Sequence, residues 1–310
     1  MSTHPREHGS RDDHRTATHR VAAVQRWPLT TPDELEAALR DGRYADGGPV
    51  RLLDVRWRLD RPDGRAEFEA GHVPGAVYVD LETELAVVPD QRRPEEGRHP
   101  LPAAADFEQS ARSWGISDGD TVVVYDNAKS TSAARAWWLL RYAGVGDVRV
   151  LDGAFREWQS AGKPIVTGTA ALPAPGDVKV EYGALPVIPL DGVLRFAESG
   201  VLIDARAGDR FRGENEPVDP RAGHIPGAVS LPTVTNVDER GRFLPASELR
   251  ARFAELGVTD ASAVGAYCGS GITAAHEAIA LTLAGFDPAV FPGSFSQWSN
   301  HPELPVATGA

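Results

Sequence analysis

The stretch Gly71-His72-Val73-Pro74-Gly75-Ala76 recurs later in the chain as Gly223-His224-Ile225-Pro226-Gly227-Ala228. The distance between the two copies is that of a whole domain and is too long for a solenoid unit. Further stretches repeat at similar distances: Leu52-Leu53-Asp54-Val55-Arg56 matches Leu202-Ile203-Asp204-Ala205-Arg206, and Gly153-Ala154-Phe155 matches Gly293-Ser294-Phe295. The sequence therefore predicts two domains with one common fold.

Short runs rich in Val, Ile and Leu, bounded by Gly and Pro, alternate in each copy with helical patterns. The clearest helical patterns cover Ala103–Trp114, Ser130–Ala143, Ala246–Leu256 and Thr273–Ala284. Because strands that alternate with helices form parallel sheets with both faces covered, the chain is predicted to be α/β. Each copy should form a mainly parallel sheet flanked by helices.

The repeat sets the expected domain boundaries at residues 21–167 for the first copy and 184–310 for the second. Between them, residues 168–183 contain prolines and show no helical period, which is typical of a linker. Residues 1–20 are polar and carry four scattered histidines, so we expect a disordered tail there rather than a metal site.

Charge and cysteine content limit the function classes. The net charge of −12 over 310 residues argues against a nucleic-acid surface or an anionic membrane face. No apolar run is long enough to cross a bilayer. One cysteine allows no internal disulfide, so a reducing cytoplasm is the expected location.

That cysteine, Cys268, follows the apolar run Ala263-Val264-Gly265-Ala266-Tyr267 and precedes Gly269-Ser270-Gly271-Ile272-Thr273 and a helical pattern. A strand that ends in a Gly-containing loop before a helix directs backbone N–H groups toward one point, which favours a thiolate there. A buried structural cysteine is the alternative, but such a cysteine seldom opens a Gly-x-Gly turn. The first copy has Asp126 at this place, so only the C-terminal copy can carry thiol chemistry.

From residue 21 onward the chain resembles the two-domain rhodanese-like sulfurtransferases. The resemblance rests on the duplicated Gly-His-x-Pro-Gly-Ala stretch, the Asp-x-Arg pairs and the single cysteine loop. Within that family, Cys268-Gly269-Ser270-Gly271-Ile272-Thr273-Ala274 looks like the 3-mercaptopyruvate sulfurtransferase pattern. Thiosulfate-preferring members typically place an Arg-Lys pair at the positions of Gly269 and Ser270. Related phosphatases use Cys-x5-Arg, and Ala274 stands where their arginine would be.

The loop residues receive roles from this chemistry. Cys268 would attack the donor sulfur, and the N–H groups of residues 269–273 with the Thr273 hydroxyl would stabilise the persulfide anion. Gly269, Gly271 and Ile272 thus belong to the expected persulfide cradle. The resemblance implies that Ser270 relays a proton to the departing pyruvate enolate; helix capping is the alternative for this serine.

Arginines that follow the second Asp-x-Arg pair are the candidate donor-binding groups. Arg210 lies in the family's substrate-binding stretch and is the expected carboxylate clamp, with Arg212 beside it. Arg206, and alternatively Arg212, would pair with nearby acids. Mercaptopyruvate enzymes usually carry a second substrate arginine several residues later, and this chain offers only Arg221 at a shifted place.

A histidine with two acidic residues from the first copy completes the candidate set. His99, Asp80 and Glu82 match the region that family members bring across the domain cleft, so they are expected to form a cross-domain proton relay. A plain surface loop is the alternative for this region.

The resulting prediction is a sulfurtransferase that moves sulfane sulfur from 3-mercaptopyruvate to a thiol, cyanide or protein acceptor through a Cys268 persulfide. A thiosulfate:cyanide sulfurtransferase is the alternative within enzymes. A persulfide carrier for one protein partner is the alternative from another class. The small anionic donor and the acceptor are the expected partners, and no metal or organic cofactor is implied.

Overall fold

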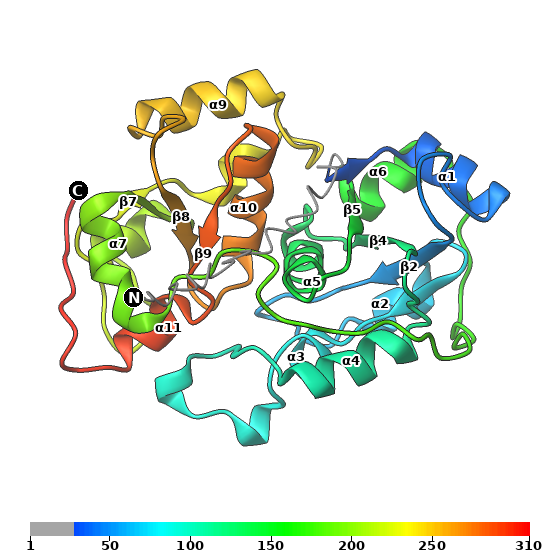
Figure 1. Cartoon of the computed structure of the whole chain (residues 1–310), viewed down its shortest axis with the longest axis horizontal. Coiled ribbons are helices and arrows are strands. Elements are labelled where there is room, and N and C mark those ends of the chain that lie inside the picture. Colours follow the sequence, from blue (N-terminus) through cyan, green and yellow to red (C-terminus); the bar gives the residue numbers. More distant parts are fainter. Residues whose placement is uncertain (1–27) are drawn as a thin grey trace, which may run out of the picture.

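The computed structural model describes residues 28–310, and the expected tail at residues 1–20 lies outside them. In this part of the chain two parallel sheets lie side by side, each with helices packed around it (Figure 1). This confirms the predicted α/β fold with two copies of one domain.

The first domain contains a five-stranded sheet of order β1-β5-β4-β2-β3, with every pair of neighbours parallel. Its strands are β1 (Leu29–Thr30), β2 (Val50–Asp54), β3 (Ala76–Tyr78), β4 (Thr121–Tyr125) and β5 (Asp147–Leu151). Its helices are α1 (Pro32–Asp41), α2 (Arg65–Ala70), α3 (Leu81–Glu84), α4 (Ala104–Ser113), α5 (Thr131–Tyr142) and α6 (Ala154–Ser160), with short 3-10 turns η1 (Pro89–Gln91) and η2 (Pro94–Glu96).

The second domain repeats this arrangement in a smaller sheet of order β7-β6-β8-β9. Its strands are β6 (Val201–Asp204), β7 (Val229–Ser230), β8 (Val264–Tyr267) and β9 (Ala289–Val290). Its helices are α7 (Val193–Ser199), α8 (Gly208–Arg212), α9 (Ala246–Glu255), α10 (Thr273–Leu283) and α11 (Ser294–Ser299), with 3-10 turns η3 (Leu190–Gly192) and η4 (Thr233–Asn236).

The repeated Gly-His-x-Pro-Gly-Ala stretch has a structural role in both copies. His72 Nδ1 lies 2.9 Å from the carbonyl oxygen of Phe68, and its ring stacks on that phenylalanine with centroids 3.8 Å apart. His224 makes the same pair of contacts with Phe211, at 2.8 Å and 3.7 Å. Since both copies share this arrangement, it explains why the stretch recurs without any need for catalysis.

The segment between the domains is attached to the first domain along its length. Val178 is buried and its N–H donates to the carbonyl of Ile116. Further on, the N–H groups of Gly183 and Ala184 donate to the carbonyl of Tyr142. The linker therefore adds to the first domain's packing and fixes the point at which the second domain begins.

The two domains share a hydrophobic interface built on α5 and α10, which pack against each other. Each helix follows the loop that ends a strand of its own sheet: α5 follows β4 and α10 follows β8. A second contact comes from the η2 segment of the first domain, which packs on α11 of the second. Figure 1 shows this segment as part of a long loop that leaves the first domain toward α11.

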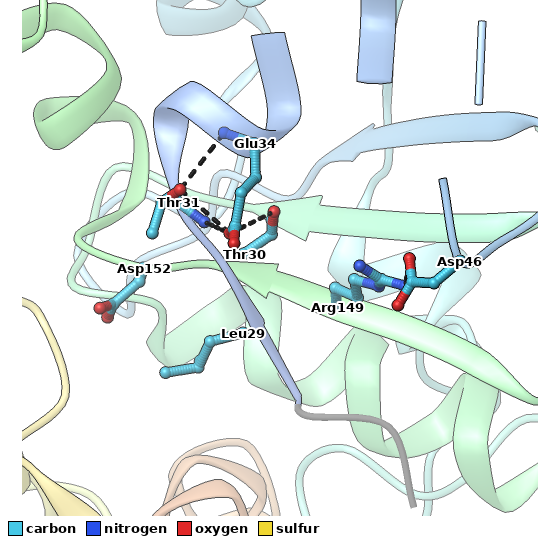
Figure 2. Close-up of a pocket in the computed structure, with 7 residues that line it drawn as sticks. All are labelled: Leu29, Thr30, Thr31, Glu34, Asp46, Arg149 and Asp152. Carbon is cyan, nitrogen blue, oxygen red and sulfur yellow. Dashed lines mark hydrogen bonds and ion pairs between the residues drawn. The ribbon is translucent and has the colours of Figure 1, made fainter. Parts of the chain in front are cut away.

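A polar cavity of about 400 Å³ lies in the first domain alone, at the ends of β1 and β5 (Figure 2). Arg149 and Asp46 face each other there as an ion pair of 2.9 Å, and Thr31 caps α1 with Glu34. None of its lining residues comes from the second domain. Among residues 28–310, no helix is both long and apolar enough to span a bilayer.

Candidate active site

Cys268 lies directly after β8, at the start of the short loop that leads into α10. The Gly271 N–H donates to its Sγ at 3.1 Å. Gly271 has φ of 78°, and a Cβ there would lie 2.1 Å from the carbonyl oxygen of Pro292, so only glycine fits. The loop therefore turns a backbone donor toward the sulfur, as the sequence predicts, while leaving Cys268 only 1% exposed.

Ser294 is a polar neighbour of the sulfur that the sequence analysis did not identify. Its Oγ accepts the Cys268 N–H at 3.1 Å, donates to the Phe291 carbonyl at 2.9 Å and lies 3.9 Å from Cys268 Sγ. The first copy has Ala154 at the equivalent place, also with positive φ. This exchange of alanine for serine between copies was the signal in the sequence.

Ser270 and Thr273 keep their hydroxyl groups free for chemistry. Ile272 is the N-cap of α10, with no side-chain hydrogen bond, so Ser270 does not cap that helix. Thr273 is its first residue. The hydroxyls of Ser270 and Thr273 take part in none of the side-chain hydrogen bonds found among residues 28–310, and Ser270 is 8% exposed.

Arg210 lies where a donor clamp is expected. An ideal Cβ on Gly269 would be 3.4 Å from Arg210 Nη1. Its other nitrogens are held by carboxylates: Nε and Nη2 donate to Glu216 at 3.1 and 2.6 Å, and Nη2 also donates to Asp219 at 2.9 Å. One edge of the guanidinium is thus anchored while Nη1 stands next to the residue that follows the nucleophile.

The other arginines of this region have structural partners. Arg212 forms a two-point ion pair with Glu214, and its side chain is 43% exposed. Arg206 is buried against Asp204 and Glu216, as its pairing alternative predicts. Arg221 donates to four backbone carbonyls at the end of α11 and beyond, so it serves that turn rather than a ligand.

Arg98 of the first domain reaches the same point as Arg210. An ideal Cβ on Gly269 would be 2.8 Å from Arg98 Nη2. Arg98 Nη1 forms an ion pair with Asp219, and the Arg98 N–H donates to Ser296 Oγ at 3.0 Å. The sequence analysis passed over this arginine, although it directly precedes His99.

His99 pairs with Glu82 within the first domain, while the expected cross-domain proton relay stays a prediction. His99 Nε2 lies 3.1 Å from Glu82 Oε1, which also accepts the indole N–H of Trp57 at 2.6 Å. Although burial opposes it, hydrogen bonds from His99, Arg92 and Trp57 lower the pKa of Glu82 to about 2. Burial lowers the pKa of His99, which favours the neutral ring. Asp80 instead caps α3 through the Glu82 N–H at 2.9 Å.

A cavity of about 470 Å³ opens beside this pair. Its lining includes Trp57, His99 and Arg98 from the first domain and Asn300 from the second. The cavity is formed almost entirely by the first domain, and Asn300 is the one lining residue from the second domain. Arg98 links the cavity to the Cys268 loop, because its side chain also reaches Gly269.

Arg135 is a second first-domain arginine that the sequence analysis missed. It lies on α5, is fully buried, and its Nη1 donates to the Gly271 carbonyl at 3.2 Å. It also donates to the carbonyls of Leu85 and His99. Burial lowers the pKa of Arg135 to about 10, which still leaves it charged at neutral pH. None of the ion pairs found among residues 28–310 gives it a carboxylate partner.

Comparison with known proteins places this geometry in a family. The family model described as "Rhodanese-like domain" matches residues 31–161 and 193–301. A Pseudomonas aeruginosa protein named as a 3-mercaptopyruvate sulfurtransferase is 42% identical over 289 residues, covering 91% of this chain and 98% of that protein. The chain belongs to the two-domain rhodanese-like sulfurtransferases.

Other relatives in this sulfurtransferase family carry both donor names. A Mycobacterium tuberculosis protein named as a thiosulfate sulfurtransferase, SseB, is 44% identical over 278 residues, covering 89% of this chain and 96% of that protein. The structure of the Escherichia coli 3-mercaptopyruvate sulfotransferase SseA matches with a TM-score of 0.74 at 30% identity, covering 87% of this chain and 99% of that one. Overall identity therefore does not choose between the two donors.

The first rhodanese-like copy fills its own loop with a carboxylate. Asp126, at the place of Cys268, accepts the N–H groups of Ala128 and Ser130 on one oxygen at 2.8 Å each. Its other oxygen accepts those of Ser132 and Ala133 at 2.8 and 3.0 Å. The loop thus retains the anion-binding character of the fold, but its anion is a fixed part of the chain.

Proposed function

We propose that the second domain is the catalytic one and transfers sulfane sulfur through a persulfide on Cys268. The observation that carries this proposal is the loop between β8 and α10, which turns the Gly271 N–H toward Sγ beside the Ser294 hydroxyl. Backbone donors at a helix start stabilise a sulfur anion. The equivalent loop of the first domain binds a carboxylate, which supports the same role for the loop of the second.

The proposed donor is 3-mercaptopyruvate. The Cys268 thiolate attacks the donor sulfur, the carbon–sulfur bond breaks, and its electron pair leaves on carbon as the enolate of pyruvate. The enolate takes up the proton that the donor thiol gives up, relayed by Ser270, whose hydroxyl has no competing bond among the described residues. Cys268 retains the sulfur as a persulfide anion within the loop formed by Gly269, Gly271, Ile272 and Thr273.

In the second half-reaction an acceptor nucleophile attacks the outer sulfur. The sulfur–sulfur bond breaks and its electron pair returns to Cys268 as thiolate. A thiol gives a new persulfide and cyanide gives thiocyanate, so the cycle closes without a net redox change. In this proposal the His99–Glu82 pair, which lines the cavity beside Arg98, exchanges a proton with an incoming thiol. The single cysteine fits an enzyme of the reducing cytoplasm.

Thiosulfate is the second candidate donor, and one observation favours it. Arg98 brings a positive charge to Gly269, although the loop has no basic side chain at positions 269 and 270. With thiosulfate the leaving group is sulfite, which needs no proton at the moment of cleavage. Initial rates with the two donors, measured on one preparation, decide between them.

Intact-mass measurement tests the persulfide. Wild-type protein treated with a donor and desalted should gain about 32 Da, the mass of one sulfur atom, and lose it on addition of cyanide. Cys268→Ser should gain nothing and transfer nothing while keeping the wild-type melting temperature within a few degrees. Turnover by Cys268→Ser, or a wild-type protein that gains no mass from either donor, would contradict the proposal.

The same preparation separates an enzyme from a carrier for one protein partner. An enzyme regenerates Cys268 with small acceptors and so completes many turnovers with excess donor and cyanide. A carrier gains one sulfur per chain and then stops. We expect many turnovers, because the Arg98 and Arg210 groups beside Gly269 suit a small anionic donor.

A further inference from the structure

Two guanidinium groups from different domains meet at Gly269, the residue directly after the nucleophile. The Cβ that Gly269 lacks would lie 2.8 Å from Arg98 Nη2 and 3.4 Å from Arg210 Nη1. Arg98 comes from the loop before α4, and Arg210 lies on α8. The two positive groups therefore stand together where a donor must pass on its way to Cys268.

Both guanidinium groups are held on their far sides by acids. Asp219 receives Arg98 Nη1 on one carboxylate oxygen and Arg210 Nη2 on the other, and Glu216 receives the Nε and Nη2 of Arg210. The nitrogens nearest Gly269, Arg98 Nη2 and Arg210 Nη1, take part in none of the hydrogen bonds found among residues 28–310. Arg98 Nε is likewise buried without a partner. The pair thus keeps unused donors at the mouth of the loop.

We propose that Arg98 and Arg210 together bind the oxyanion group of the sulfur donor, so that the first domain supplies half of the donor site. This assignment deepens the proposed function and rests on it. A carboxylate or a sulfonate-like group offers two oxygens to the two guanidinium groups, which is the arrangement arginine binds best. The donor sulfur then extends past Gly269 toward Cys268.

The backbone before Arg98 is fixed on the second domain independently of its side chain. The Arg98 N–H donates to Ser296 Oγ, and a Cβ on Gly97 would lie 2.9 Å from the Gly293 carbonyl oxygen. The segment therefore keeps its place on α11 when the guanidinium is removed. This makes Arg98→Ala a test of the charge itself rather than of the contact between domains.

The absence of a side chain at Gly269 leaves room for the Arg98 guanidinium. Its φ is outside the left-handed region, so its backbone does not require glycine. The side chain that would clash at this position is Arg98, whose Nη2 takes the space of a Cβ. Glycine at 269 and arginine at 98 are thus a matched pair: the positive charge reaches the loop from the other domain instead of from a loop side chain.

A double-mutant cycle tests the assignment on the full-length protein. We measure kcat and KM for 3-mercaptopyruvate and for thiosulfate in the wild type, Arg98→Ala, Gly269→Ala and the double variant. Arg98→Ala should lower kcat/KM for each donor that the wild type uses about 10- to 100-fold, mainly through KM. Arg98→Lys should recover part of this loss. Arg195→Ala, which removes an exposed arginine on α7, is the matched control and should match the wild type.

Gly269→Ala should raise the donor KM in the wild-type background, because its methyl group displaces Arg98, and should add little when Arg98 is already alanine. Losses in donor kcat/KM that multiply in the double variant would overturn the assignment, and so would an unchanged donor KM in a folded Arg98→Ala. Either result would leave the proposed function standing. A wild-type protein that takes sulfur from neither donor would instead overturn the proposed function, and the assignment with it. The KM for the acceptor should stay unchanged in all of these variants. A simple loss of contact between the domains would change the acceptor KM as well.

Discussion

At the scale of single residues, Cys268 shows that burial alone does not distinguish a nucleophile from a structural thiol. Its 1% exposure would suit a core position, and free cysteine is among the most buried residue types. Its immediate partners are polar, however: the Gly271 N–H and the Ser294 hydroxyl. A core thiol has no need of such groups, whereas a sulfur that becomes negative does.

Ser270 gives a prediction that separates the two donors. Its free hydroxyl is proposed to protonate the pyruvate enolate, and sulfite needs no such proton when it leaves. We therefore expect Ser270→Ala to lower kcat with 3-mercaptopyruvate about 10- to 100-fold while changing the thiosulfate rate less than twofold. Steady-state rates with cyanide as the common acceptor measure both. Equal losses with the two donors would contradict the relay and point to a role of Ser270 in the second half-reaction.

Several residues of the candidate site could be predicted from the sequence, because each lies in a short stretch that is recognisable by itself. Cys268 was found because its loop has a recognisable composition, and His99 with Glu82 because their stretch resembles the family. Arg98 and Arg135 were missed, since what they touch is decided by the docking of two domains. One signal was present for Arg135: it is the only charged residue between Thr131 and Leu140 in the helix α5.

At the scale of elements, each domain contains the same strand, loop and helix. The loop holds the Asp126 carboxylate in the first domain and the Cys268 sulfur in the second. α5 begins five residues after Asp126, and α10 begins five residues after Cys268. In the first domain the loop binds a carboxylate through four N–H groups. The fold could be predicted because the apolar strand and the helical pattern repeat on either side of this loop, although the loop after Asp126 has no glycine. The different roles proposed for the two loops could be predicted only from the exchange of aspartate for cysteine.

The carboxylate of Asp126 should therefore contribute strongly to the stability of the first domain. Asp126→Ala leaves four N–H groups without their acceptor, three of them buried and that of Ala128 partly buried. We expect the free energy of unfolding to fall by about 3–5 kcal/mol. Urea unfolding followed by tryptophan fluorescence measures the change. Asp126→Asn keeps one acceptor oxygen and should lose less. Folded Asp126→Ala should still gain one sulfur on Cys268, and loss of that adduct without unfolding would contradict the division of labour between the copies.

At the scale of the whole molecule, the domain without a cysteine contacts the proposed site of the other domain. Its Arg98 reaches Gly269, and its Arg135 donates to the Gly271 carbonyl. Its His99–Glu82 pair lines the cavity that Arg98 also lines. Two kinds of contact hold these groups: α5, which carries Arg135, packs on α10, while Arg98 forms an ion pair with Asp219 and donates its N–H to Ser296.

Arg135 offers the test of this dependence. It is a buried cation whose acceptors among the described residues are backbone carbonyls, one of them that of Gly271 in the loop that holds Cys268. We expect Arg135→Met to slow alkylation of Cys268 by iodoacetamide at pH 7 about tenfold, because the substitution removes a buried positive charge from beside that loop. Arg135→Lys keeps the charge and should retain most of the rate. Arg141→Met, on the same helix, is the control and should react as the wild type does.

Far-ultraviolet circular dichroism and the melting temperature show which variants remain folded, and the Arg135→Lys comparison isolates charge from packing. Equal alkylation rates in folded Arg135→Met and wild-type protein would mean that the second domain stabilises its thiolate without help from the first.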